Sequence, residues 1–205
     1  MYFIVLNFYI CNFRRSPILF QDQKSRFHTG LRLSYSASLD PTKNYFEILD
    51  HEVNFVVDAK QLSKKHRHLQ TQFHPDKFSN KSKEEQDHSE NMSALINEAY
   101  STLTNPMKRA LYLLELNGDP LLEGDQPVLD EEFLVEILEL NEEIDDADCE
   151  ADIEALKVVA EEKISELHEK LKMCFDEKRI PDAKMIVAKM QYFHNVKDQL
   201  KYKDY

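Results

Sequence analysis

The sequence predicts an all-α protein with two helical domains. Apolar residues recur at spacings of three and four in several segments between about residue 58 and residue 203, which is the period of amphipathic helices. The C-terminal part, from about residue 129 onward, shows no strand signals. A stretch with two prolines and a glycine, residues 119–130, separates the two groups of helical patterns. With 205 residues, the chain is long enough for two small domains, each with its own core.

Residues 1–39 differ in composition from the rest. The block Met1–Phe13 is almost wholly apolar, but it is shorter than the roughly 20 residues that span a bilayer. The segment Arg14–Ser38 is rich in arginine and serine and poor in acids, as mitochondrial transit segments are. We therefore expect a mitochondrial targeting or disordered segment. A secretory signal or membrane anchor is an alternative, and the leading apolar block fits none of these well.

The first domain is expected over residues 40–117. Asp40-Pro41-Thr42 punctuates its start, and Thr42 or Asn44 can cap a short helix that runs through Leu49. A longer helix is predicted from Asp58 to Phe73. The residues expected in the core of these two helices are Tyr45, Phe46, Ile48, Leu49, Leu62, Leu69 and Phe73.

The tripeptide His74-Pro75-Asp76 follows the longer helix. A proline disfavours the α conformation in the residue before it, so Pro75 should end the helix at His74. Lys77–Lys81 reads as a polar loop, and a second helical pattern continues from Met92 to Leu103. The two helices should form an αα-hairpin with an imidazole and a carboxylate at its tip.

His74 and Asp76 could in principle bind a metal or take part in catalysis. They lack the further ligands that a zinc or iron site requires, and no known motif places a serine or cysteine nucleophile beside them. A recognition role fits better, because an exposed carboxylate can accept a charge-assisted hydrogen bond from a partner's arginine.

The helix before the tripeptide is basic, although the whole chain carries a formal net charge of -12. Its cations are Lys60, Lys64, Lys65, Arg67 and His68. They form either a solvated face or a docking surface for an acidic partner, and the adjacent tripeptide favours docking. The overall negative charge should repel nucleic acid. Only three glycines occur, which excludes glycine-rich phosphate loops.

The second domain is expected over residues 129–205, after a linker at 118–128. Before the linker, Pro106 opens a helix that Asn117-Gly118 should close. After it come three helical patterns, at 129–146, 151–177 and 181–203, which predict a three-helix bundle.

The first bundle helix carries more apolar residues than a core requires. At 100° per residue, Phe133, Ile137, Leu140 and Ile144 fall within about 60° and can supply the core. Leu134 and Leu138 lie about a quarter turn away. Val135 lies further round, beside the acids Glu139, Glu142 and Asp146. An apolar strip bordered by carboxylates is typical of a protein-binding face, unless the leucines pack on the last helix or on the first domain.

These features resemble two parts of one known family. The segment Tyr45–Leu49, the basic helix, His74-Pro75-Asp76 and the segment Ile96–Tyr100 resemble a J domain, the co-chaperone module that stimulates DnaK-type ATPases. Further similarities point to the HscB family, the J-proteins of iron-sulfur cluster biogenesis. They are Asn105-Pro106, Arg109-Ala110, Tyr112–Leu114 and the acidic helix from Phe133 to Glu143. The resemblance spans roughly residues 43–203.

The resemblance implies two binding sites. A mitochondrial DnaK-type chaperone would be bound by His74, Pro75, Asp76, Lys60, Lys64, Lys65 and Arg67. An iron-sulfur scaffold protein of the IscU type would be bound by Leu134, Val135, Leu138, Glu139, Glu142, Asp146 and Tyr192. Bacterial members have methionine at the position of Val135 and phenylalanine at that of Tyr192, so the shape of this face is roughly kept.

Animal mitochondrial members also have an N-terminal domain with paired Cys-x-x-Cys motifs. Here Cys11, Cys149 and Cys174 are isolated, so we expect free thiols, a reducing compartment and no bound zinc.

The sequence thus predicts a co-chaperone of the mitochondrial matrix that delivers a scaffold protein to a chaperone and activates the chaperone's ATPase. We expect no enzymatic activity of its own and no cofactor. Neither nucleic acid nor a membrane is expected as a partner, and the sequence is compatible with a homo-oligomer. The alternatives are a J-protein for another client, a structural protein with an inert hairpin, and an enzyme that uses His74 and Asp76.

Overall fold

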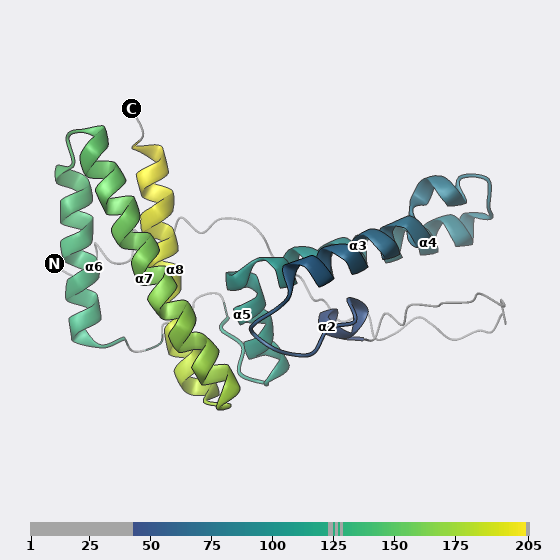
Figure 1. Cartoon of the computed structure of the whole chain (residues 1–205), viewed down its shortest axis with the longest axis horizontal. Helices are drawn as coiled ribbons and strands as arrows, with labels where there is room; N and C mark the ends of the chain where they lie inside the picture. Colours follow the sequence, from purple (N-terminus) through teal and green to yellow (C-terminus); the bar gives the residue numbers. More distant parts are fainter. Residues whose placement is uncertain (1–42, 123–124, 126, 128, 204–205) are drawn as a thin grey trace. The chain divides into compact units, whose positions relative to one another are not determined.

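The computed structural model describes residues 43–122, 125, 127 and 129–203, all within a unit that runs from Leu39 to Tyr205. The expectations for the segment 1–39, and for Thr42 as a cap, lie outside the described residues. Every regular element in the described part is helical, which confirms the predicted class (Figure 1). None of its helices is long and apolar enough to cross a membrane.

The first domain begins with α2 (Tyr45–Ile48), a single helical turn. Asn44 and Glu47 form a reciprocal capping box at its start, so Asn44 is the cap. Tyr45, Phe46 and Ile48 are buried, as predicted. The ring of Tyr45 stacks on Tyr112 at 4.5 Å, and its backbone N–H donates to the Tyr112 hydroxyl at 3.0 Å. These contacts attach α2 to the helix Pro106–Leu116, which carries Tyr112.

The helices α3 (Ala59–Phe73) and α4 (Lys83–Thr104) form the predicted hairpin and run side by side (Figure 1). Asp58 caps α3, and Ser82 with Glu85 makes a capping box on α4. The two helices bury these apolar residues in one core: Leu62, Leu69, Phe73, Met92, Ile96, Ala99 and Leu103.

A polar network joins the two helices beside this core. The amide oxygen of Asn97 on α4 accepts from Gln70 at 2.7 Å and lies 3.0 Å from Nε2 of His66, both on α3. The His66 ring stacks on Tyr100 at 4.2 Å. The hairpin therefore has a fixed register, because directional hydrogen bonds accompany the apolar packing.

The segment after the tripeptide is more ordered than the sequence suggested. Lys77–Lys81 was expected to be a polar loop, but Pro75–Phe78 forms a 3-10 turn, η1, and the Phe78 side chain is buried. Pro75 is pre-organised for the first position of a helical turn. The turn packs on α4, which allows Phe78 to leave water.

The helix α5 (Pro106–Leu116) begins at Pro106, with Asn105 as its cap. It ends as predicted at Asn117-Gly118. Gly118 has a φ of 79°, which glycine adopts without strain. The N–H of Gly118 donates to the Glu115 carbonyl at 3.0 Å, and that of Asp119 donates to the Leu114 carbonyl at 3.1 Å. This pair of bonds is a Schellman motif, which satisfies the last carbonyls of the helix.

The second domain consists of α6 (Glu131–Asp146), α7 (Glu150–Asp176) and α8 (Ile180–Tyr202). As predicted, α6 buries Phe133, Ile137, Leu140 and Ile144. An ion pair between Glu136 and Lys163 joins α6 to α7. The three helices thus form the expected bundle.

The two domains touch within the unit that contains both. Helix α5 packs against α8, and Phe55, from the loop before α3, stacks on Phe175 of α7 at 5.6 Å. The guanidinium of Arg109 lies 5.1 Å from the centre of the Phe55 ring. This contact also covers His168, whose ring is 6.1 Å from that of Phe55. The pKa of His168 is lowered, mainly by burial and then by Arg109.

Candidate functional site

The tripeptide is exposed at the tip of the α3–α4 hairpin. The His74 side chain is 51% exposed and that of Asp76 is 90% exposed. The backbone N–H of Asp76 donates to Nδ1 of His74 at 3.3 Å. The same Nδ1 atom lies 3.6 Å from the Asp76 carboxylate, a contact that is an ion pair only when the imidazole is charged. At 90% exposure, the carboxylate is presented to solvent.

The backbone of the tip is closed by short-range bonds. The N–H of Lys77 donates to the His74 carbonyl at 3.0 Å, and the Ser79 hydroxyl donates to the Asp76 carbonyl at 2.9 Å. His74 thus acts through its ring as the cap of η1. In this arrangement His74 orients the turn, Pro75 starts it, and Asp76 presents its carboxylate to solvent.

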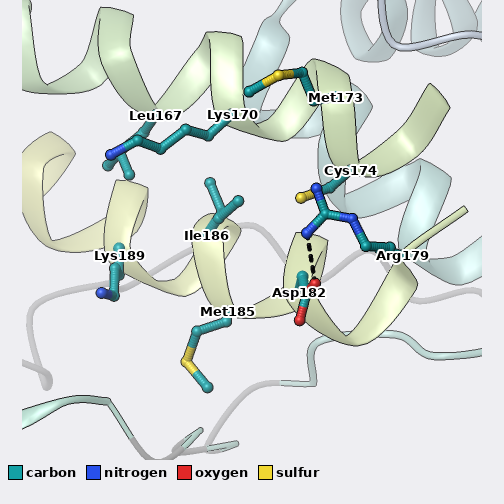
Figure 2. Close-up of a pocket in the computed structure, with 9 residues that line it drawn as sticks. All are labelled: Leu167, Lys170, Met173, Cys174, Arg179, Asp182, Met185, Ile186 and Lys189. Carbon is teal, nitrogen blue, oxygen red and sulfur yellow. Dashed lines mark hydrogen bonds and ion pairs between the residues drawn. The ribbon is translucent and has the colours of Figure 1, made fainter. Parts of the chain in front are cut away.

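The tripeptide lies outside the groove between α7 and α8. Within the described ranges, no group of three or more histidine, cysteine or acidic side chains is placed to hold a metal ion. The described part has a groove of about 320 Å³ between α7 and α8 (Figure 2), and its lining includes neither His74 nor Asp76. The recognition role of the tip stays a prediction.

That groove does not offer a reactive group. Burial raises the pKa of the Cys174 thiol at its edge, and a thiol is a weak nucleophile until it loses its proton. The nearby Arg179 is held by Asp182 at 2.7 Å, the contact dashed in Figure 2, and by Glu177 at 2.7 Å. Its charge is therefore already paired within the chain.

The basic residues of α3 divide into two groups. Lys60, Lys64 and Arg67 are exposed and share one face, because they are four and three residues apart. Lys65 points elsewhere: it lies about 140° around the helix from Lys60, and its ammonium contacts the Asp50 carboxylate at 3.1 Å. The sequence did not predict this pairing, since Asp50 belongs to the preceding turn and carries no helical signal.

The apolar strip on α6 lies outside the buried core. Leu134 and Leu138 are half-buried, and Val135 is 47% exposed. On a helical wheel the strip lies on the flank opposite Glu136, which pairs with α7. The predicted surplus of apolar surface therefore exists, and neither leucine is fully covered by the described part of the chain.

The acids beside the strip are free to meet a partner. Glu139, Glu142 and Asp146 are exposed, and none of them forms an ion pair with another described residue. A row of unpaired carboxylates next to half-exposed leucines provides both charge for steering and apolar area for contact.

Tyr192 has a mixed role. Its ring meets Phe133 edge-on at 5.7 Å, and burial raises the pKa of its hydroxyl. It is half-buried and packs against the core. Tyr192 therefore supports α6 from α8, while part of the residue stays accessible.

The comparison with known families agrees with the two domains. Residues 44–112 match the DnaJ domain, and residues 129–201 match the HSCB C-terminal oligomerisation domain. The first match contains the hairpin with its tripeptide, and the second contains all the predicted scaffold-binding residues.

Similar proteins extend over most of the chain. It is 38% identical to the human iron-sulfur cluster co-chaperone protein HscB over 164 residues, which are 80% of this chain and 70% of that protein. It is 40% identical to the co-chaperone protein HscB of Proteus mirabilis over 113 residues, 55% of this chain and 65% of that protein.

Solved structures lead to the same family. The crystal structure of human HscB matches with a TM-score of 0.79 and 33% identity, covering 89% of this chain and 96% of that one. The HscB chaperone of Vibrio cholerae matches with a TM-score of 0.69 and 30% identity, covering 78% and 96%. With a J domain, the HscB-type C-terminal domain and this overall similarity, the chain belongs to the HscB family of iron-sulfur cluster co-chaperones.

Proposed function

We propose that this protein is a mitochondrial co-chaperone that binds an iron-sulfur scaffold protein and brings it to a DnaK-type chaperone, whose ATPase it stimulates. Catalysis belongs to the chaperone. The observation that carries the proposal is the combination of two surfaces in one chain: a bare carboxylate at the tip of a J domain, and a half-exposed apolar strip on the HscB-type bundle.

The chaperone-binding surface consists of His74-Pro75-Asp76 together with the exposed cations Lys60, Lys64 and Arg67. Asp76 accepts a hydrogen bond from a cationic side chain of the chaperone, which is stronger than a bond between neutral groups. The cations attract an acidic patch and raise the rate of encounter. Lys65 contributes less to this surface, because Asp50 already neutralises it.

The scaffold-binding surface consists of the α6 strip and its acidic border. Leu134, Val135 and Leu138 provide the apolar centre, and Tyr192, whose ring meets Phe133 edge-on, contributes from α8. Glu139, Glu142 and Asp146 set the approach and register of a scaffold with a basic contact face. This division follows the general plan of protein interfaces, in which an apolar centre is surrounded by a polar rim.

The mitochondrial matrix is the proposed location. It is supported by the arginine- and serine-rich composition of Arg14–Ser38. A fusion of residues 1–39 to a fluorescent protein should enter mitochondria, whereas the same fusion with its arginines replaced by glutamate should stay outside.

The test of the whole proposal measures steady-state ATP hydrolysis by a mitochondrial DnaK-type chaperone. Hydrolysis should rise on adding the protein and should rise further when an iron-sulfur scaffold is also present. Stimulation without any effect of the scaffold would indicate a J-protein for another client. An absence of stimulation would indicate an inert hairpin.

A further inference from the structure

The end of α3 leaves a backbone carbonyl that its own helix does not satisfy. In a continuing helix the carbonyl of Phe73 would accept from the N–H four residues later, on Lys77. That N–H instead donates to the His74 carbonyl at 3.0 Å. A buried carbonyl without a partner is costly, so another donor is needed at this point.

Ser89 of α4 supplies that donor. Its side chain is fully buried, and its hydroxyl donates to the Phe73 carbonyl at 2.9 Å. A serine inside a helix can instead bond the carbonyl four residues earlier in its own helix. Here the hydroxyl crosses the hairpin, so the peptide group between Phe73 and His74 is attached to α4.

A second bridge holds the far side of the tip. Gln86 lies one turn before Ser89 on α4, and its amide donates to the carbonyls of Ser79 at 3.1 Å and Lys81 at 3.0 Å. The tripeptide thus lies between two anchored points of the backbone. Both anchors come from the same face of α4, because residues three apart are neighbours on a helix.

We propose that Ser89 and Gln86 are positioning residues for the chaperone-contacting tripeptide: they hold the backbone on either side of His74-Pro75-Asp76 in the orientation that the chaperone binds. This inference rests on the proposed function. Without the two bridges the tip visits other orientations, and the apparent affinity falls in proportion to the fraction that stays competent.

The experiment titrates the full-length protein against the chaperone ATPase at a temperature well below melting. Ser89→Ala should raise the concentration for half-maximal stimulation by about fivefold, as expected if about one fifth of tips remain competent. Maximal stimulation at saturation should be unchanged. The thiol of Ser89→Cys is a weaker donor than the hydroxyl. The half-maximal concentration for this variant should therefore lie between those of wild type and Ser89→Ala.

Ser93→Ala is the matched control. Ser93 lies one turn further along the same helix and also donates across the hairpin, but to the side chain of Gln70 at 3.1 Å rather than to the tip backbone. Its replacement should leave the half-maximal concentration within about twofold of wild type. Equal shifts for Ser89→Ala and Ser93→Ala would overturn the proposal, since a general loosening of the hairpin would explain both.

Two further measurements keep the test decisive. If Ser89→Ala does not fold, Gln86→Ala decides, and an unchanged half-maximal concentration for that variant would reject the proposal. Nuclear magnetic resonance should show the amide signals of Asp76 and Lys77 shifted or broadened in Ser89→Ala and unchanged in Ser93→Ala. This last result is independent of the ATPase, so it separates a failure of the positioning role from a failure of the proposed function.

Discussion

The hairpin tip and the α6 strip present themselves to partners in opposite ways. At the tip, one charged group is displayed by a backbone turn that caps and cross-helix hydrogen bonds hold in place. On α6, regular helix displays a row of side chains, and the helix is held by its buried face. The tip therefore depends on the exact shape of a few peptide groups, whereas the strip depends on the apolar area that its leucines leave uncovered.

This difference predicts how each region fails. A single polar substitution of Asp76 should remove function with little effect on folding, because this exposed side chain carries no core packing. The strip should fail in proportion to the apolar area removed.

Replacing Asp76 by asparagine should abolish stimulation of the chaperone ATPase. The change removes the negative charge but keeps the shape, and the carboxylate is 90% exposed, so the helical circular dichroism and the melting temperature should match wild type. His74→Gln should act in the same direction, because it removes the ring that caps the turn. Scaffold binding should be unchanged in both. Full stimulation by Asp76→Asn would show that the hairpin does not act through this carboxylate.

Replacing Leu134 and Leu138 together by alanine should weaken scaffold binding by several kcal/mol, since truncation of a central interface side chain costs about 2 kcal/mol or more. Binding is measured by isothermal titration calorimetry, and the melting temperature should fall only slightly.

Ile137→Ala is the control for this pair. Ile137 lies on the buried face of the same helix, and truncating a buried isoleucine costs about 2 to 5 kcal/mol of stability. It should lower the melting temperature strongly while binding remains near normal below melting. If the double leucine variant behaves like Ile137→Ala, these leucines belong to the core and the scaffold binds elsewhere.

Reversing the charge of Lys60, Lys64 and Arg67 to glutamate should slow association with the chaperone. The wild-type rate should fall with added salt, because exposed charges more than about 10 Å apart are screened near 0.1 M. Lys65→Glu serves as the comparison: it breaks the pair with Asp50 and should change the association rate less than any one of the other three. Association rates are measured by stopped flow. If they change with neither salt nor charge reversal, a docking role for α3 is excluded.

A smaller effect is the pH dependence of the free energy of unfolding, which concerns the whole fold and therefore both regions. Burial lowers the pKa of His168 and of His194 from 6.5. Arg109 and Glu169 act on His168, while Lys197, His168, Asp198 and Lys201 act on His194. Below about pH 6.5 the unfolded chain then binds more protons than the folded one, so stability should decrease as pH falls from 7 to 5.

Chemical denaturation at several pH values measures this dependence. The double variant His168→Leu and His194→Leu should show a flatter profile, because the titrating groups are gone. A wild-type stability that stays constant between pH 7 and pH 5 would contradict the expectation.

Local signals in the sequence predicted most of the helices and several of their ends, although α4 begins at Lys83, before the predicted pattern from Met92, and η1 was not predicted. Pro75 ends α3, Pro106 starts α5 and Gly118 closes it, each through a conformational preference of one or two residues. The core face of α6 follows from helical spacing alone, so Phe133, Ile137, Leu140 and Ile144 were identified correctly. The surplus strip could be recognised for the same reason, since any apolar residue outside that face has to be exposed or covered by something else.

What the sequence could not supply is the set of contacts between residues far apart in the chain. Phe78 was expected in a polar loop, yet η1 packs on α4 and buries it. Lys65 has the same charge as the neighbouring basic residues of α3, yet in the folded chain it pairs with Asp50. Nothing in the spacing of Ser89 distinguishes it from Ser93. Helical periodicity and caps are local properties of the chain, whereas the partner of a given charge or hydroxyl is decided only when the helices pack.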